Sequence, residues 1–382
     1  MQITGEWLSD VRAQRVMAML EDAGFQAYVV GGCVRNALLD APIADVDIAT
    51  DAYPDVVVKL AEAAGFHAIP TGIEHGTITV VCNDEPFEIT TFRNDVSTDG
   101  RRATVAFSDN ITDDALRRDF TVNALYAKAD GTVVDPLNGL PDIAARRIKF
   151  IKDADKRIEE DYLRILRFFR FYAWYGDVNN GIDPNGLAAC ASHVDGISKL
   201  SKERLGSEMA KLLAALDPAP TLAAMAACGV LAQVIAGADT QFLAPLIHLE
   251  GKHPPRWQRR LAVLGGENIG RALCLSNVNK RYLSDIKQVL LSSENVAICA
   301  YLHGGNETLD AKLVEAASLA APLSPNLDAE ILRGTEAVFP VQASDLFAEF
   351  EKGPALGVEL KRLKRVWLDS DLKATKSELL TH

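Results

Sequence analysis

The stretch YVVGGCVRNALLDAPIADVDIAT, residues 28–50, decides how the first part of this chain folds. Its apolar beginning is typical of a buried strand, and two glycines, Gly31 and Gly32, follow directly. The run VRNALL after them predicts a helix, and glycines before a helix let the backbone approach an anion such as phosphate. The stretch therefore predicts a strand, a tight turn and a helix, with Arg35 as a charged donor beside the turn.

Two aspartates, Asp45 and Asp47, stand at the start of the next apolar run. Side chains at positions i and i+2 of a strand share a face, so we expect two like charges side by side. A divalent cation would neutralise them, and Mg²⁺ typically binds one or two carboxylates together with phosphate oxygens. A solvated Asp-Val-Asp at a strand end is the plain alternative for an isolated match. The glycine turn and Arg35 nearby favour a combined site for metal and triphosphate, although the dinucleotide-binding pattern G-x-G-x-x-G is absent.

Composition describes an ordinary globular protein. The chain has 382 residues, of which 48% are apolar and 24% charged, which allows two or three domains. The six cysteines are scattered without zinc-binding spacing, so we expect reduced thiols and a cytoplasmic protein. No signal core or run of 18 apolar residues occurs, so no membrane partner is expected. The net charge of −12 argues against bulk attraction to nucleic acid, and DNA is not expected as a partner, but residues 140–215 are slightly basic and could bind a polyanion.

The chain changes character near residue 145. Before it, short β-branched runs alternate with turns, and TITVVCNDEPFEITTFR predicts a hairpin that turns at residues 83–86. After it, the pattern is helical almost throughout. The expected fold class is α+β, with early helices at about 11–24, 34–40 and 54–65, and with a head at 1–145, a helical neck at 146–215 and a helical body at 216–382.

The segment 162–172 is apolar on nearly all sides of a helix, so this helix should be largely buried. Nevertheless it contains Arg164, Arg167 and Arg170, and Asp161 starts it. Buried arginines are rare unless they are paired or face a ligand. Two interpretations stay open at this point: an internal salt-bridge ladder from Asp161 to Arg164, or arginines that face a ligand.

The stretch GGCVRNALL…IADVDIAT resembles the first motif of the tRNA nucleotidyltransferase and bacterial poly(A) polymerase family, a branch of the polymerase-β-like nucleotidyltransferases. The resemblance covers residues 25–210 and is to the class II enzymes. Two positions depart from the family pattern: Asn36 stands where an aspartate is usual, and Ala103 where a proline is common. Four further stretches agree in order: LRRDFTVNALY (116–126), DPLNGLPDI (135–143), EEDYLRILRFFRF (159–171) and SKERLGSE (201–208).

This resemblance implies a polymerase-β-like head with a mixed β-sheet, followed by a helical neck and body. It implies that Asp45 and Asp47 are catalytic and bind Mg²⁺, and that Asp161 and Arg164 read the edge of an incoming C or A base. The remaining positions that it assigns to nucleotide binding are Gly31, Gly32, Arg35, Arg118, Arg167 and Arg170.

Two of these assignments have plain alternatives. Arg118 could instead be a helix-end arginine paired with Asp119. Glu88, in FEITTFR, is on a strand that could neighbour the aspartates and supply a third catalytic carboxylate, or it could be an ordinary strand residue paired with Arg93.

The implied activity is template-independent CCA addition to the 3′ end of tRNA from CTP and ATP. Two Mg²⁺ ions would assist in-line attack of the 3′-hydroxyl on the α-phosphate, with release of pyrophosphate. The alternatives are a poly(A) polymerase, a partial CC- or A-adding enzyme, and a non-catalytic nucleotide- or RNA-binding protein on the same fold. The acidic chain disfavours poly(A) synthesis. A shortened loop marks CC-adding relatives, whereas residues 92–120 here are long and polar around Asp99, Gly100, Arg101 and Arg102, so we expect a mobile loop and complete CCA addition.

Overall fold

The structure is a computed structural model that describes residues 1–99, 102–348, 350 and 352–381. The chain forms two compact units. The first comprises Met1–Leu212 with Pro220–Val234, and the second comprises Leu213–Ala219 with Ile235–His382. The finer division at residues 145 and 215 that the sequence suggested stays a prediction.

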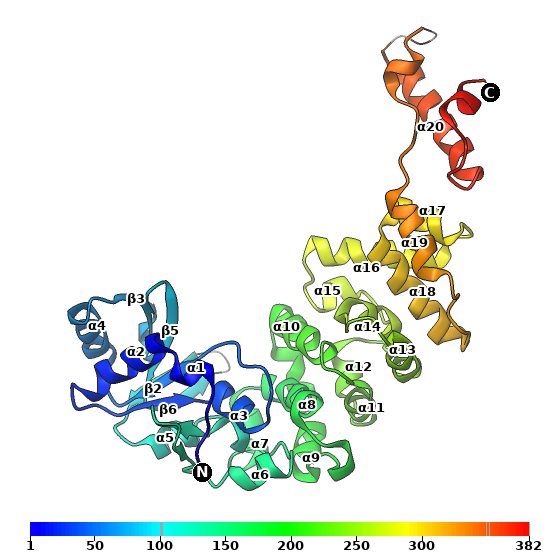
Figure 1. The fold of residues 1–382 in the computed structure, drawn as a ribbon. Coiled ribbons are helices and arrows are strands. Elements are labelled where there is room, and N and C mark those ends of the chain that lie inside the picture. The colour runs from blue at the N-terminus through cyan, green and yellow to red at the C-terminus, as the bar shows by residue number, and fades with distance from the viewer. Residues whose placement is uncertain (100–101, 349, 351, 382) are drawn as a thin grey trace. The chain divides into compact units, whose positions relative to one another are not determined.

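A mixed seven-stranded sheet forms the centre of the head (Figure 1). Its strand order is β3-β4-β5-β2-β1-β8-β9, in which β2 and β5 run parallel and the other neighbours antiparallel. The expected α+β head with a mixed sheet is therefore confirmed. The strands are β1 (Ala27–Val30), β2 (Asp47–Thr50), β3 (His67–Gly72), β4 (Thr77–Cys82), β5 (Glu85–Thr91), β8 (Tyr126–Ala127) and β9 (Val133–Val134).

The hairpin predicted around residues 83–86 joins β4 to β5, with a tighter turn than expected. Cys82 pairs with Glu85, so only Asn83 and Asp84 form the turn. Both have positive φ, 49° and 64°, as a two-residue hairpin turn of type I′ requires. Asn and Asp tolerate that conformation better than other residues with a side chain, which is why this turn could be found from sequence.

A second, two-stranded sheet lies within residues 92–120, the segment that we expected to contain a mobile loop. Strands β6 (Arg93–Asp99) and β7 (Arg102–Phe107) pair antiparallel, from Arg93 opposite Phe107 to Asp99 opposite Arg102. The ring of Phe107 lies 5.4 Å from that of Tyr53, so the base of this hairpin packs on the head. The pairing of these two strands was not predicted from the sequence. Gly100 and Arg101, which the same expectation included, lie outside the described residues.

Helices surround the sheet and continue as the neck (Figure 1). Helices α2 and α4 pack on the sheet, and α3 follows β1 directly, as predicted from the opening stretch. The helices of the first unit, including short 3₁₀ turns, are α1 (Glu6–Ser9), α2 (Val11–Glu21), α3 (Gly32–Leu38), α4 (Pro54–Ala63), η1 (Ile73–His75), α5 (Ile111–Leu116), η2 (Thr121–Asn123), α6 (Leu140–Ala144), α7 (Ala154–Glu160), α8 (Leu163–Tyr175), η3 (Val178–Asn180), α9 (Pro184–Ser192), η4 (Val194–Lys199), α10 (Lys202–Leu213), α11 (Ala219–Ala227) and α12 (Val230–Val234).

Helix α8 is the helix expected at 162–172. Its apolar side chains, such as Phe168 and Phe169, are fully buried. Arg164, Arg167 and Arg170 are only partly buried, since a spacing of three residues places them along one face of the helix. The face that carries the arginines is therefore the one that is not packed into the apolar core.

The second unit is entirely helical among its described residues. Arg260 lies in its interior and donates hydrogen bonds to the carbonyls of Leu213, Ala215 and Leu216, which ties the segment Leu213–Ala219 to this unit. No described helix in the chain has the length and apolarity needed to cross a bilayer. The helices of this unit are α13 (Leu243–Glu250), α14 (Trp257–Leu264), α15 (Ile269–Ala272), α16 (Asn277–Leu291), α17 (Val296–His303), α18 (Gly305–Leu319), α19 (Leu327–Glu336), η5 (Ala343–Leu346), α20 (Pro354–Asp369) and α21 (Lys376–Leu380).

Candidate active site

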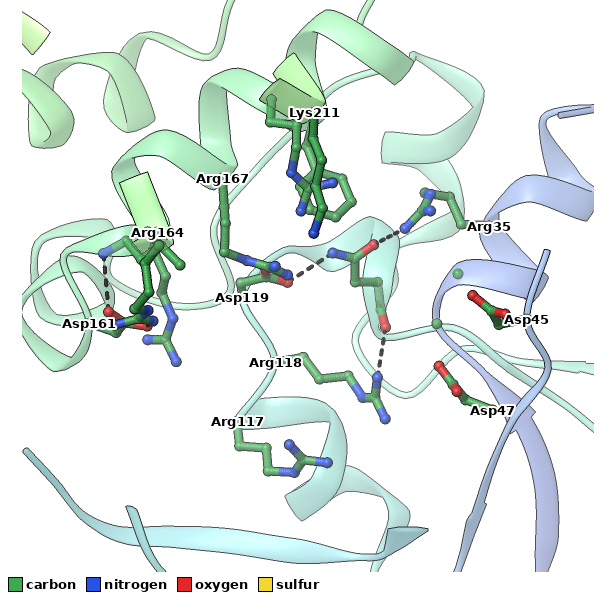
Figure 2. Close-up of a pocket in the computed structure, with 17 residues that line it drawn as sticks. Arg35, Asp45, Asp47, Arg117, Arg118, Asp119, Asp161, Arg164, Arg167 and Lys211 are labelled. Atoms are coloured by element: carbon green, nitrogen blue, oxygen red, sulfur yellow. Dashed lines mark hydrogen bonds and ion pairs between the residues drawn. The ribbon is translucent and has the colours of Figure 1, made fainter. Parts of the chain in front are cut away.

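One pocket of the first unit, with a volume of about 740 Å³, brings together nearly all the side chains that the sequence singled out (Figure 2). Carboxylates and glycines from the head form one part of its lining, and arginines from the neck form another. Every predicted site residue except Glu88 lines it: Gly31, Gly32, Arg35, Asp45, Asp47, Arg118, Asp161, Arg164, Arg167 and Arg170.

Asp45 and Asp47 lie next to each other at one side of the pocket (Figure 2). Strand β2 begins only at Asp47, and Asp45 belongs to the irregular segment before it. The prediction that both aspartates are carried by the strand was therefore wrong. The two aspartates are nevertheless close together, because the irregular segment leads directly into β2, and both residues line the same pocket.

Glu88 lies beside Asp47 on the neighbouring strand. Strands β2 and β5 are parallel, and their register places Asp47 opposite Glu88. Glu88 lines a second cavity, of about 470 Å³, whose lining also includes Asp45 and Asp47. The structure thus brings the three predicted carboxylates together, although Glu88 lines this second cavity and not the one that the arginines line.

The charges around Asp47 are not balanced. Burial raises the pKa of Asp47, and the nearby carboxylates of Glu88 and Asp45 raise it further, while Arg118 opposes them. Within the described residues, no group of three or more His, Cys, Asp or Glu side chains is arranged as a complete metal site. The aspartate pair nevertheless fits Mg²⁺, because this ion is commonly held by one or two carboxylates and completes its shell with water and substrate oxygens.

The glycine turn closes the pocket beside these carboxylates. Gly31 has φ 73° and ψ −112°, a conformation that side chains with a Cβ rarely adopt. A Cβ on Gly31 would also lie only 3.2 Å from Nη1 of Arg118. Gly32 is the first residue of α3, and a Cβ there would meet only ordinary contact with Arg35. Glycine is therefore required at 31 both by the backbone and by the arginine packed against it.

Arg35 is buried and holds the head against helix α8. Its guanidinium donates hydrogen bonds to the side chains of Asn36, Asn123 and Tyr175, the last at 2.9 Å, and its charged carbon lies 4.2 Å from the centre of the Tyr175 ring. Burial lowers the pKa of Arg35, since all of these partners are neutral. Asn36, the residue that departs from the family pattern, also donates to the carbonyl of Pro42, so it keeps a structural role without the usual charge.

Arg118 follows helix α5 and points into the pocket, but its partner is not the one expected. It donates to Asp114 at 2.9 Å and to the hydroxyl of Tyr126. Burial would raise the pKa of Asp114, but Arg118 and Arg117 outweigh it and lower that pKa to about 2. The alternative that paired Arg118 with Asp119 was therefore wrong, because Asp119 is turned toward α8.

Asp161 and Arg164 lie at the end of the pocket opposite the aspartate pair (Figure 2). The proposed ladder between them does not form among the described residues. Instead Asp161 accepts a hydrogen bond from Arg204 at 2.6 Å, and Arg164 donates to Glu160 at 2.5 Å. The i,i+3 pair is avoided because each side chain has a closer partner in a neighbouring helix, Arg204 in α10 and Glu160 at the end of α7.

The other two arginines of α8 are paired with buried carboxylates. Arg167 donates to Asp119 at 2.7 Å, and Arg170 donates to Glu208 at 2.5 Å. Asp119 also accepts from Asn123, whose side-chain oxygen accepts from Arg35, so a chain of hydrogen bonds runs from the head to α8 (Figure 2). Burial would raise the pKa of Asp119, but Arg167 and Asn123 lower it to about 2.

The sequence analysis did not predict the residues that pair with Asp161, Arg167 and Arg170. Their signal was present in the motif stretches already recognised, since Asp119 and Asn123 are four residues apart in LRRDFTVNALY, and Arg204 and Glu208 are four apart in SKERLGSE. A spacing of four places Arg204 and Glu208 on one face of α10. The pocket residues that were not predicted are Arg117, Asp119, Asn123, Leu163, Phe171, Arg204 and Lys211.

The arrangement suits a ligand that is itself a polyanion and that carries a cation. Carboxylates at one side attract the cation, and a wall of guanidiniums attracts the anion. The pocket arginines that the sequence predicted each donate hydrogen bonds to a neighbouring side chain, so their positions are fixed before a ligand binds.

Comparison with known proteins identifies the family. Residues 27–149 match the family described as "Poly A polymerase head domain", and residues 181–241 match "Probable RNA and SrmB- binding site of polymerase A". A CCA-adding enzyme of Streptococcus pyogenes is 34% identical over 378 residues, covering 92% of this chain and 91% of that protein. The human mitochondrial CCA tRNA nucleotidyltransferase 1 is 42% identical over 186 residues, which is 48% of this chain and 43% of that protein.

A solved structure agrees over nearly the whole chain. The CCA-adding enzyme of Bacillus stearothermophilus, determined in complex with CTP, superposes with a TM-score of 0.77 at 27% identity and covers 94% of this chain and 93% of its own. The fold of this chain, with its mixed-sheet head and helical body, therefore matches that of the relative, as the resemblance implied. The chain belongs to the family of the CCA-adding tRNA nucleotidyltransferases.

Proposed function

We propose that this protein adds C, C and A in turn to the 3′ end of tRNA, taking the nucleotides from CTP and ATP and releasing pyrophosphate. The observation that carries the proposal is that one pocket has the aspartate pair at one end and Asp161 with Arg164 at the other, and that arginines line it between the two ends. A nucleoside triphosphate has the matching order of groups: a base at one end and a metal-binding triphosphate at the other. The CTP complex of the Bacillus relative supports the same ligand class.

Arg164 and Asp161 would read the base. Both hydrogen bonds described for the Arg164 guanidinium use Nη1, with the Arg157 carbonyl and Glu160 as acceptors, so its remaining N–H groups are available to a base edge. Asp161 accepts from Arg204 and from the Leu163 amide, which holds its carboxylate in place with lone pairs to spare. One donor fork and one acceptor held side by side can complement the Watson–Crick edge of C or of A.

The aspartates would hold Mg²⁺, with Glu88 next to them as a third carboxylate or as an acceptor for the proton of the attacking hydroxyl. When bound, this metal would lower the pKa of the tRNA 3′-hydroxyl and stabilise the charge on the leaving pyrophosphate. Burial and Glu88 raise the pKa of Asp47, and the positive charge of Arg118 opposes this rise, as a bound cation would. Arg167 and Arg170 would bind the triphosphate, each kept in place by Asp119 or Glu208.

The cytoplasm stays the compartment that we propose. All six cysteines are free thiols, and four of them are buried: Cys33, Cys82, Cys190 and Cys299. Free thiols persist where the surroundings are reducing.

The test uses three tRNA substrates, one lacking the whole CCA end, one ending in its first C and one ending in both. Each is incubated with the protein, Mg²⁺ and one labelled nucleotide at a time. The proposal predicts that CTP extends the first two substrates and that ATP extends only the third, by a single residue. Incorporation of ATP into the first substrate, or no incorporation into any of them by correctly folded protein, would refute it.

A further inference from the structure

The ring of Phe171 has three guanidiniums around it. Phe171 lies in α8, lines the pocket and is only 4% exposed. The guanidinium carbons of Arg170, Arg35 and Arg167 lie 4.3, 5.1 and 5.3 Å from the centre of its ring. All three distances fall within the range in which a cation is attracted by the face of an aromatic ring.

The carboxylates nearby do not balance these three charges. Asp119 pairs with Arg167, and Glu208 pairs with Arg170. Arg35 forms no ion pair with any residue that the structure describes, and its hydrogen-bond acceptors are the neutral side chains of Asn36, Asn123 and Tyr175. Three like charges close together in a poorly solvated site would repel one another, so something else must favour their gathering.

We propose that Phe171 is a positioning residue for the triphosphate of the incoming nucleotide, because its ring gathers Arg35, Arg167 and Arg170 along one wall of the pocket. This inference rests on the proposed function and deepens it. An aromatic ring attracts cations through its quadrupole but carries no net charge. A third carboxylate at this place would also hold the arginines, but it would cancel the positive charge that a triphosphate needs and would repel the ligand.

The surroundings of the ring support a role in positioning. Phe171 is braced by Phe120, at 5.2 Å between ring centres, and by Tyr175, at 5.7 Å. Tyr175 in turn stacks on Arg35 and accepts its hydrogen bond. The two neighbouring rings therefore hold Phe171 in place, and the three arginines around it line the pocket.

Phe168, one turn earlier in α8, provides a matched control. It is fully buried and packs against Phe120, Phe150 and Phe169, and no cation is described over its ring. Fluorine atoms weaken the quadrupole of a phenylalanine ring while changing its shape little. The same series of fluorinated phenylalanines can therefore be placed at either position in the full-length protein.

The experiment measures KM and kcat for CTP and ATP with one, two and three fluorine atoms on residue 171. We expect KM to rise at each step, to on the order of tenfold for the trifluoro ring, with a smaller change in kcat. Discrimination against UTP and GTP should stay unchanged, because Asp161 and Arg164 are not touched. The same series at Phe168 should leave KM within about twofold, and F171L should resemble the trifluoro protein.

Two results would overturn the inference: a flat KM across the series at 171, or an equal rise at 168, which would indicate general disturbance of the core. Calorimetric binding of CTP in the absence of tRNA gives a second measurement, and the affinity should fall along the same series. If CTP affinity falls along this series but the wild-type protein adds no nucleotide to tRNA, the proposed function is refuted and the role of Phe171 in binding the triphosphate is retained.

Discussion

The dipeptide Arg-Arg occurs at 117–118 in the first unit and at 259–260 in the second, with opposite consequences. Arg117 and Arg118 have side chains that are 15% and 18% exposed, share Asp114 and line the pocket. Arg259 and Arg260 are each 1% exposed and lie inside the helical body with Glu250. Both pairs form ion pairs with carboxylates, so pairing alone does not separate a binding arginine from a structural one. The difference is whether a cavity lies on the other side of the guanidinium.

The largest effect should come from the pocket carboxylates. Asp45→Asn and Asp47→Asn should each lower the rate of nucleotide addition by about 10³-fold or more, since loss of a metal ligand removes several kcal/mol of transition-state stabilisation. Thermal unfolding should hardly change, because a like-charge repulsion is relieved. Asp55→Asn, at an exposed carboxylate of α4 in the same unit, is the control. Normal turnover in either pocket variant would remove the metal site from this account.

The second effect concerns the body and is on stability. Arg260→Met should cost about 3–5 kcal/mol in the free energy of unfolding, because it removes one of the two arginines that pair with the buried Glu250 and leaves three carbonyls without their donor. Urea unfolding measures this cost. Arg281→Met, which removes an arginine that is 87% exposed and lies 3.8 Å from Asp285, should change the same quantity by less than about 1 kcal/mol. Similar costs for the two variants would erase the distinction between buried and exposed arginines.

The third effect is on base selection in the pocket. Asp161→Ala or Arg164→Ala should weaken discrimination of CTP and ATP from UTP and GTP by roughly 10- to 150-fold, the value of one charged hydrogen bond of about 1.5–3 kcal/mol. A competition assay with all four nucleotides measures it, and Glu159→Ala, an exposed neighbour on α7, serves as control. If selectivity stays intact, these two side chains are structural like Arg260.

The fourth effect is the response of the two units to acid. Asp114 and Asp119 have folded-state pKa values of about 2, below the ordinary value of 3.8, so each contributes on the order of 2 kcal/mol of stability at neutral pH that is lost as the pH falls from about 5 to 2. In the second unit the pKa of Asp371 is also lowered to about 2, but this side chain is partly exposed and solvent weakens its ion pairs, whereas burial raises the pKa of the interior Asp310, so its protonation favours the folded state as the pH falls.

Hydrogen exchange measured at pH 7, 5 and 3 should therefore show the first unit losing protection before the second. Asp119→Asn should flatten the pH dependence of the first unit and leave that of the second unchanged. Loss of protection in the second unit first would mean that these carboxylates do not control acid stability.

The fifth prediction concerns which product the protein makes and not how fast it makes it. Shortening the chain across residues 95–104, in the β6–β7 hairpin, should leave CC addition intact and abolish the terminal A. Gel analysis of products from a tRNA that lacks CCA separates these outcomes. A shortened protein that still completes CCA would show that this segment does not take part in the change from CTP to ATP.

The elements that sequence predicted well are those with local causes. The strand, the Gly31 turn and helix α3 follow from adjacent residues, and so does the hairpin turn at Asn83 and Asp84. Helix α8 follows from its run of apolar residues, whereas the partly exposed face formed by its three arginines was not predicted. The motif stretches were enough to name ten of the seventeen residues that line the pocket, because their order along the chain is specific to the family.

The predictions that failed depended on contacts between distant segments. The partner of Asp161 is Arg204 in another helix, and the partner of Arg167 is Asp119 in the head, so no local rule could choose them. The start of β2 at Asp47 depends on where its pairing with β1 and β5 begins. The pairing of β6 with β7 was not predicted, because the segment around Asp99 is polar and resembles a loop.

The central claim is tested most directly by sequencing the product that the wild-type protein makes from a tRNA without its CCA end, with all four nucleotides present at equal concentration. The account predicts that nearly every product carries C, C and A in that order, and that extension stops after one A. Products that end at CC, carry long A-tails or contain U or G at these positions would contradict it.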